Sequence, residues 1–232
     1  MERKRTLLLC SYGLRPGQIT LETLALLKSC DAVFSNSLDR FSAEKLRPYC
    51  GELRLVKGAR WEPLAKKIFA AFSKKNKIAF LTYGNPFFLN PPACLLAEEA
   101  ARRGIAFEVA EGVSSFDGII NQLRLGQFAE EGLRLVNLGD GSEAARGRAP
   151  AMDTLFFSLW TLEAGKPGLK KKFLSGLASA YPPEHPVLVI DHPGSVRTTI
   201  GQLGAALGKA ALTTTLFVPA AAPAVKLPGR KS

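Results

Sequence analysis

Two short segments of the chain, residues 83–87 and 111–115, carry the residue types best suited to holding a ligand through backbone contacts. Each follows an apolar run typical of a buried strand, at 78–82 and 105–110, and each precedes a helix-like segment. A strand that ends in glycine or proline leaves backbone N–H and C=O groups at the open edge of a sheet, where a ligand can approach closely. Two such edges side by side predict one ligand-binding cleft.

Other catalytic motifs do not occur in the sequence. There is no Gly-x-Gly-x-x-Gly after the first strand, no phosphate-binding loop and no His-Glu-x-x-His, and the chain has only 2 histidines. Asp191, His192 and Ser195 include the residue types of a hydrolase triad, but they are neighbours in sequence and lack a Gly-x-Ser-x-Gly turn. A loop at the end of a strand is the better interpretation of residues 191–195.

The formal net charge of +11 is distributed over several basic runs, at 66–67, 74–77, 170–172 and 230–231. Such runs are most often solvated helix faces, and they also suit an acidic partner such as RNA or a polyanionic small molecule. No RNA-binding motif with interleaved aromatic residues accompanies the charge. Nucleic acid is therefore possible as a partner but is not indicated.

The cysteines and the apolar runs indicate a cytoplasmic protein without a membrane segment. The 4 cysteines are spread along the chain with no Cys-x-x-Cys pair, which favours buried reduced thiols over a disulfide framework or a metal site. No apolar run approaches the ~20 residues of a membrane span. The apolar run at 7–10 is too short for a secretory signal and is typical of a first strand.

The first half of the chain alternates between strand-like and helix-like patterns. Helices are predicted at 20–29, with Thr20 as the cap, at 61–74 and at 91–103. The strands between them are predicted at 6–11, 32–35, 53–56, 78–82 and 106–110. This alternation predicts an α/β domain with a mainly parallel, doubly wound sheet.

The second half has more extended chain and predicts a second domain with a mixed sheet. Strands are expected at 133–138, 154–160, 187–191 and 212–218, helices at 168–180 and 196–207, and a loop at 139–150. The boundary is expected near Gly112, which gives domains at 1–111 and 112–219. Residues 220–232 are rich in alanine, proline and lysine and are expected to form a disordered tail.

Strand-end segments that contain glycine or proline occur in the order 12–17, 83–86, 111–115 and 192–195. Together with the helix-like segment 19–29, the stretch 29–34 that follows it and the segment 193–203, this order resembles the tetrapyrrole methylase family over roughly residues 5 to 219. The resemblance implies two α/β domains with S-adenosylmethionine bound in the cleft between them. It also implies a homodimer, which is usual for the family.

The same resemblance implies a set of cofactor contacts. The family's Gly-Asp-Pro loop matches 84–87, and its Pro-Gly-Val-Ser loop matches 111–115. Backbone at the glycines would hold the cofactor, while the two serines would bind its methionine part or cap the next helix. The implied cofactor-binding residues are Pro16, Tyr83, Gly84, Asn85, Pro86, Phe87, Gly112, Val113, Ser114 and Ser115.

Within the family the chain most resembles the borosin-type peptide backbone N-methyltransferases. The shared features are a Tyr-Gly-x-Pro loop at 83–86, a Gln-Ile-Thr-Leu helix opening at 18–21 and a Thr-Leu-Phe-Val-Pro end at 215–219. The resemblance implies that Arg60 and Tyr83 are catalytic, with Tyr83 as the base and Arg60 stabilising negative charge. The chain departs from these enzymes in two respects: tyrosines expected around the arginine are absent, and the tail holds no Val/Ile-rich peptide. The implied substrate is therefore a separate peptide or small molecule.

Three alternatives stay open on the sequence. The same fold could methylate a tetrapyrrole or corrinoid precursor. It could also methylate ribosomal RNA, for which the basic charge gives mild support. A third interpretation is a non-catalytic protein that retains the cofactor site, since the tyrosines around Arg60 are missing.

Overall fold

The computed structural model describes residues 4–56, 61–125, 132–139, 151–165, 167–191, 194–208, 210–211 and 213–221. The chain forms two compact units, Met1–Asn121 and Gln122–Ser232, and each is described here by itself. The limits 1–111 and 112–219 stay a prediction, and nearly all of the expected tail lies outside the described residues.

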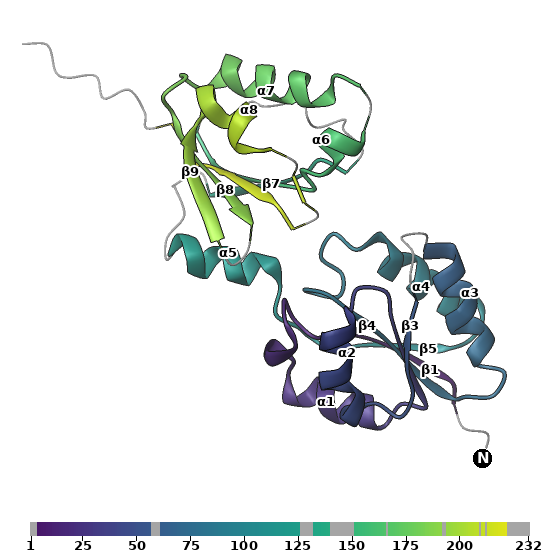
Figure 1. Cartoon of the computed structure of the whole chain (residues 1–232). Helices are drawn as coiled ribbons and strands as arrows, with labels where there is room; N and C mark the ends of the chain where they lie inside the picture. The colour runs from purple at the N-terminus through teal and green to yellow at the C-terminus, as the bar shows by residue number, and fades with distance from the viewer. Residues whose placement is uncertain are drawn as a thin grey trace, which may run out of the picture. The chain divides into compact units, whose positions relative to one another are not determined.

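Unit 1 is built from alternating strands and helices, as the sequence predicts (Figure 1). Its strands are β1 (Thr6–Ser11), β2 (Ala32–Ser35), β3 (Leu53–Leu55), β4 (Lys77–Thr82) and β5 (Ala106–Val109). Its helices are α1 (Leu21–Lys28), α2 (Arg40–Leu46), α3 (Trp61–Ala71), α4 (Pro91–Arg102) and α5 (Ser115–Leu123). The last two residues of α5 belong to the second unit. Two short 3-10 helices are η1 (Pro16–Gln18) and η2 (Arg47–Tyr49). The sequence patterns missed α2, whose first turn is capped by Asp39 accepting from the Ser42 N–H at 2.9 Å.

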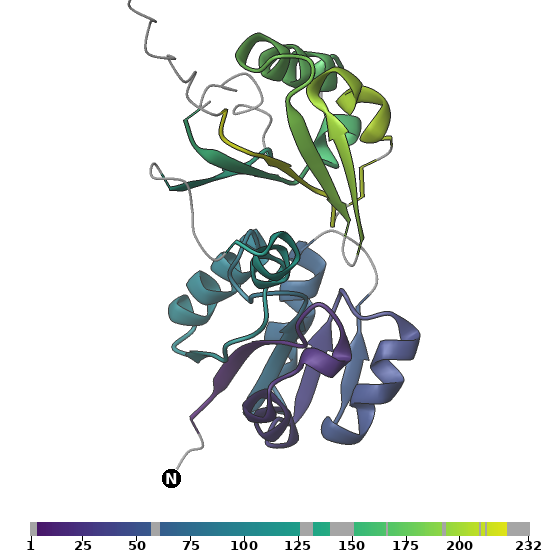
Figure 2. The same cartoon turned by 90° about the vertical axis from the view of Figure 1, so that its left-hand side faces the viewer.

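The five strands of unit 1 form one sheet in the order β3-β2-β4-β1-β5, and all of its strand pairs are parallel. Figures 1 and 2 show helices on both faces of this sheet. Because side chains alternate across a strand, Leu7 and Leu9 of β1 pack with α3 and α4, while Leu8 and Cys10 pack with α1 and α2. The predicted parallel, doubly wound α/β domain is confirmed.

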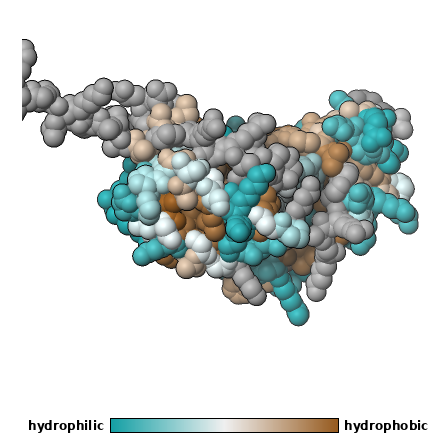
Figure 3. Space-filling view, turned by 90° about the horizontal axis from the view of Figure 1, so that it is seen from above, coloured by the Kyte–Doolittle hydropathy of each residue, from teal (hydrophilic) through white to brown (hydrophobic). Residues whose placement is uncertain are grey.

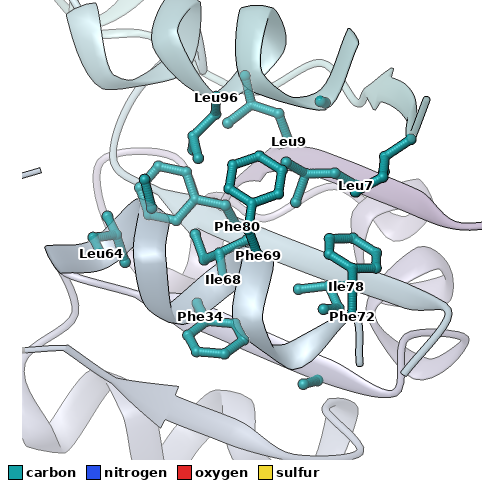
Figure 4. Close-up of a cluster of buried hydrophobic side chains, with 14 of the residues drawn as sticks. Leu7, Leu9, Phe34, Leu64, Ile68, Phe69, Phe72, Ile78, Phe80 and Leu96 are labelled. Atoms are coloured by element: carbon teal, nitrogen blue, oxygen red, sulfur yellow. The ribbon is translucent and has the colours of Figure 1, made fainter. Parts of the chain in front are cut away.

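The hydrophobic core between the sheet and the helices α3 and α4 is rich in phenylalanine (Figure 4). Ile68 and Phe69 of α3 and Phe72, just after the helix, pack in one cluster with Phe34 and Phe80 from β2 and β4. Phe34 and Phe80 are each 1% exposed. This packing fixes the strands, and with them the position of the loops that follow the strands.

Unit 2 holds a second five-stranded sheet of mixed pairing. Its strands are β6 (Leu133–Asn137), β7 (Asp153–Phe157), β8 (Pro186–Asp191), β9 (Gly194–Thr199) and β10 (Thr215–Val218), in the order β6-β7-β10-β8-β9. Only β6 and β7 pair in parallel, and the other pairs are antiparallel. The remaining elements are α6 (Thr161–Ala164), α7 (Leu169–Ala180), η4 (Ile200–Gln202) and α8 (Leu203–Ala206). The predicted mixed sheet is confirmed.

The helix expected at 196–207 is wrong for its first part. Residues 194–199 form β9, which pairs antiparallel with β8 so that Val187 lies opposite Thr198. The β-branched residues Val196, Thr198 and Thr199 favour a strand, and the hairpin with β8 satisfies their backbone. Helical structure begins only at η4 and α8.

The polar surface in Figure 3 carries hydrophobic areas interspersed with hydrophilic residues. Among the described residues, no helix has the length and apolar character needed to cross a membrane. The described residues also hold no group of three or more His, Cys, Asp or Glu side chains arranged to bind a metal ion.

The cysteines are free thiols in different surroundings. Cys10 and Cys30 are buried, Cys50 is half-buried and Cys94 is exposed. Burial raises the pKa of Cys30 and that of Cys50 to about 11, because desolvation penalises the thiolate. The sequence-based expectation of buried thiols therefore holds for two of the four.

We expect alkylation to discriminate among these thiols. At pH 8, a pKa of about 11 leaves a thiolate fraction about a hundredfold smaller than an ordinary pKa of 9 would. A short pulse of iodoacetamide on the folded chain should label Cys94 first, and peptide mass spectrometry locates the adduct. Equal labelling of Cys30 and Cys94 in the native protein would contradict this account, while labelling of all four in urea provides the control.

Candidate ligand site at the ends of three parallel strands

Three adjacent strand ends converge at one edge of the unit 1 sheet. β1 lies between β4 and β5, with Ser11 paired to Thr82 on one side and Leu9 paired to Val109 on the other. The loops after these parallel strands therefore start at the same edge. The sequence predicted that the loops after β4 and β5 would lie side by side, and the structure places the loop after β1 between them.

The loops after β1 and β4 continue the pairing of their strands. The Tyr12 N–H donates to the Thr82 carbonyl at 3.2 Å, and the Gly84 N–H donates to the Gly13 carbonyl at 3.0 Å. Gly13 and Gly84 have φ of +74° and +67°, a left-handed conformation that glycine adopts without strain. A Cβ added to Gly84 would meet nothing within 4 Å. The side-chain position of Gly84 therefore faces unfilled space, although Gly84 itself is buried.

Gly112 brings the third loop against the first two. A Cβ at Gly112 would lie 2.6 Å from the Ser11 Cβ and 3.6 Å from the Gly84 carbonyl oxygen. The same Ser11 hydroxyl accepts a hydrogen bond from the Gly13 N–H at 2.8 Å. Only glycine permits this approach, so Gly112 joins the ends of β1, β4 and β5 into one structure.

The segment after Gly84 is a tight turn held by its own polar side chains. Asn85 Oδ1 accepts from the Phe87 and Phe88 N–H groups at 3.0 and 3.1 Å, and Asn90 Nδ2 donates to the Pro86 carbonyl at 2.8 Å. Asn85 thus shapes the loop with its side chain.

The two phenylalanines of this turn have different surroundings. Phe87 is 40% exposed and packs edge-on against Phe107, with ring centroids 6.3 Å apart. Phe88 is half-buried and lies 6.4 Å from Phe116 of α5. Phe88 therefore connects the turn to the helix, and Phe87 keeps surface available to a ligand.

Ser114 caps the helix that follows β5. Its hydroxyl oxygen accepts from the Phe116 and Asp117 N–H groups at 3.0 and 3.2 Å, and Asp117 Oδ2 accepts from the Ser114 N–H at 2.7 Å. This reciprocal arrangement has the logic of a capping box. Ser115 is the first residue of α5, so capping belongs to Ser114 alone, and the Ser114 hydroxyl proton can still be donated to a ligand.

Tyr83 is half-buried and packs against a second tyrosine. Its ring centroid lies 6.2 Å from that of Tyr12, at an interplanar angle of 69°. The Tyr12 hydroxyl donates to the Ser37 carbonyl at 3.2 Å, and burial raises the pKa of Tyr12. Tyr12 therefore fixes one side of Tyr83 and ties the β1 loop to the β2 loop.

Of the other expected site residues, Pro16 opens η1 beyond the first loop. Gln18 of this turn braces the loop because its Oε1 accepts from the Leu14 N–H at 2.9 Å. Val113 is half-buried between Gly112 and Ser114. Arg60 lies outside the described residues, so its catalytic role stays a prediction.

Several residues at this edge were given no role in the site from the sequence, namely Ser11, Tyr12, Gln18 and Asp117, although Tyr12 and Gln18 lie in the motifs at 12–17 and 18–21. Two of them had a usable signal. Tyr12 and Tyr83 each follow the last residue of a neighbouring strand, and the spacing of Ser114 and Asp117 is that of a capping box. Ser11 had no such signal, because only its contact with Gly112 across strands reveals its role.

Replacement of Gly112 tests this close approach. We expect Gly112→Ala to lower the free energy of unfolding by about 1–3 kcal/mol, because the added methyl group must displace Ser11. Urea denaturation measures the change. Gly17→Ala is the matched control, since a Cβ there meets nothing within 4 Å. Equal stability of the two variants would show that the contact is not tight.

The solved structures most relevant here share the fold of this chain. A cobalamin biosynthetic enzyme, cobalt precorrin-4 methyltransferase, superposes with a TM-score of 0.69 at 18% identity over 94% of this chain and 96% of its own. Uroporphyrin-III C-methyltransferase from Thermus thermophilus gives a TM-score of 0.69 at 20% identity, over 94% of this chain and 96% of its own. The same enzyme complexed with S-adenyl homocysteine matches at 17% identity, over 92% and 97%, with a TM-score of 0.69.

The family model covers most of the chain. No protein with a curated description matches the sequence significantly. The model of the tetrapyrrole (corrin/porphyrin) methylases matches residues 11–204, which include the ends of β1, β4 and β5. The chain therefore belongs to the tetrapyrrole (corrin/porphyrin) methylases, a family of S-adenosylmethionine-dependent methyltransferases.

Proposed function

We propose that the chain transfers a methyl group from S-adenosylmethionine to backbone amide nitrogens of a separate peptide. The observation that carries the proposal is the position of Tyr83, a half-buried residue packed against Tyr12 at the strand ends and next to the unfilled side-chain position of Gly84. The borosin-like motifs at 18–21, 83–86 and 215–219 support the choice of acceptor.

The residues at the strand ends fit the cofactor. Gly84 has a positive φ and its side-chain position faces unfilled space, Gly112 is held close to Ser11, and the Ser114 hydroxyl retains a proton to donate. We propose that Gly84, Asn85, Gly112 and Val113 hold it by backbone, with Pro16, Pro86, Phe87, Ser114 and Ser115 around it. When bound, the cofactor supplies an electrophilic methyl group on a sulfonium. The strand ends then have to orient donor and acceptor ~3–3.5 Å apart.

An amide nitrogen needs a base before it can accept a methyl group. We propose that the Tyr83 phenolate takes the amide proton. Because a free tyrosine has a pKa of ~10, a phenolate at neutral pH needs a nearby cation to stabilise it. Arg60 is proposed as that cation and as the group that stabilises charge on the peptide carbonyl oxygen. The adjacent Tyr12 stays a protonated phenol, because burial raises its pKa.

Methylation of a tetrapyrrole or corrinoid precursor is the second candidate. The similar solved enzymes are named for precorrin and uroporphyrin substrates, and the family carries the name of these compounds. A carbon acceptor of that kind needs less from Tyr83 than an amide does, because no amide proton has to be removed. The importance of Tyr83 for the rate therefore separates the two candidates.

We expect Tyr83→Phe to reduce transfer to a peptide by about 10²–10⁴-fold, the usual contribution of a general base. Binding of S-adenosylhomocysteine, measured by calorimetry, should stay within a few-fold. The activity assay is mass spectrometry of a co-expressed candidate peptide encoded beside the gene, with methylation detected as steps of about 14 Da per methyl group. The rate of methyl transfer is then measured with the purified enzyme and the purified peptide.

Tyr49→Phe is the matched control for this experiment. Tyr49 closes η2 and contacts Lys28 through its ring, away from the ends of β1, β4 and β5. Its loss of a hydroxyl should leave the rate unchanged. If Tyr83→Phe methylates the peptide as fast as the unaltered protein, Tyr83 is not the base. If only a precorrin-like compound is methylated, the second candidate is correct.

We also propose that the chain acts as a homodimer, as the family resemblance implies. Light scattering should give about twice the 25.0 kDa mass of one chain. A mass near that of one chain at micromolar concentration would refute the dimer.

A further inference from the structure

A basic groove runs along the outer strand of the unit 1 sheet. It has a volume of about 540 Å³ and is formed by the edge strand β3, the second half of α3 and the turn after α3. Its described lining consists of Phe34, Arg54, Leu55, Val56, Lys67, Ala70, Ala71, Ser73, Lys74 and Lys75. The turn after α3 precedes β4, so this groove extends toward the edge of the sheet opposite the candidate cofactor site.

The charges of the groove are unbalanced. Four of its described lining residues are cationic and none is acidic. Glu52 pairs with two of them, at 2.6 Å from Arg54 Nε and 2.9 Å from Lys75 Nζ. Hydrogen bonds from Arg54 and Lys75 lower the pKa of Glu52 to about 2, so Glu52 is already ionised and fully engaged. Lys67 and Lys74 are exposed and form no ion pair with a described residue.

The groove also contains a strand edge with outward-facing backbone groups. Val56 N–H donates to the Ser35 carbonyl, and the Glu52 carbonyl accepts from the Val33 N–H, so alternate residues of β3 face β2. By the twofold periodicity of a strand, the N–H and C=O groups of Leu53 and Leu55 point to the other side. No described strand pairs with that side of β3.

These features favour an extended acidic peptide over a nucleic acid. An added strand would pair with Leu53 and Leu55, place alternate side chains on Val56, Ala70 and Ala71, and direct its carboxylates to the lysines. Stacking of bases needs exposed aromatic rings, but Phe34 is 1% exposed and Arg54 lies over its ring at 5.5 Å.

We propose that the groove between β3 and α3 binds an acidic segment of a partner protein in extended conformation, by strand addition to β3. Lys67 and Lys74 attract the carboxylates of this segment. The outward N–H and C=O groups of Leu53 and Leu55 form its hydrogen bonds and so set its register. The proposal stands apart from the methyl acceptor, because it concerns binding at a different part of unit 1.

The test uses a fluorescent decapeptide of alternating glutamate and valine and the full chain, with binding followed by anisotropy at low salt. Lys67→Glu combined with Lys74→Glu should weaken binding by about tenfold or more, because two attractive contacts become repulsive. Lys171→Glu with Lys172→Glu, the same change on the exposed face of α7, should leave binding unchanged.

Three further probes distinguish the mechanism. A glutamine–valine decapeptide should bind at least about tenfold more weakly, which tests charge. Two further glutamate–valine decapeptides carry N-methyl groups on every second backbone amide, one on the glutamate amides and the other on the valine amides. The peptide whose methyl groups remove the N–H donors that face β3 should bind more weakly than the other. Equal binding of both methylated peptides, or equal effects of the two lysine pairs, would overturn the proposal. Displacement of the peptide by oligothymidylate at lower concentration than by unlabelled peptide would also overturn it, in favour of nucleic acid.

Discussion

The close approach of Gly112 to Ser11 is the constraint on which the candidate site depends. Ser11 ends the central strand β1, and its hydroxyl already holds the Gly13 N–H at 2.8 Å. A residue larger than glycine at position 112 would push the loop after β5 away from the loops after β1 and β4. The contact therefore decides whether the loops form one ligand-binding edge or three separate turns.

The other features of the edge are organised around that contact. Gly84 continues the pairing of β4 with the β1 loop, and its side-chain position faces unfilled space. Asn85 and Ser114 use side-chain oxygens to fix the turns on either side. Tyr83 stands beside these turns, with its ring packed edge-on against that of Tyr12. Loops held on a rigid framework of strands are the usual place for residues that bind a ligand.

Much of this fold could be predicted from sequence because local and tertiary preferences agree. The runs of β1 and β4 are apolar on both faces, and proline at the start of α4 and threonine before α1 mark helix starts correctly. Residues 196–207 misled the prediction because their apolar spacing suits a helix, whereas the pairing of β9 with β8 decides the structure.

The site was predictable to a similar extent and for the same reason. The loops at Gly84 and Gly112 could be predicted because glycine in a sequence marks positions where the backbone needs a positive φ or a close approach that other residues do not allow. The positions of Ser11 and Tyr12 depend on the register between β1 and its neighbours, which only the assembled sheet supplies. The loops at Gly84 and Gly112 match the motifs of the whole family, so they indicate a cofactor more sharply than a substrate.

The central claim is that the ends of β1, β4 and β5 hold the cofactor, and hydrogen–deuterium exchange tests it most directly. S-adenosylhomocysteine added to the unaltered chain is expected to slow exchange in peptides that cover residues 12–17, 83–88 and 111–116, because bound backbone amides are protected. Protection confined to other segments, or none at saturating ligand, would contradict the account.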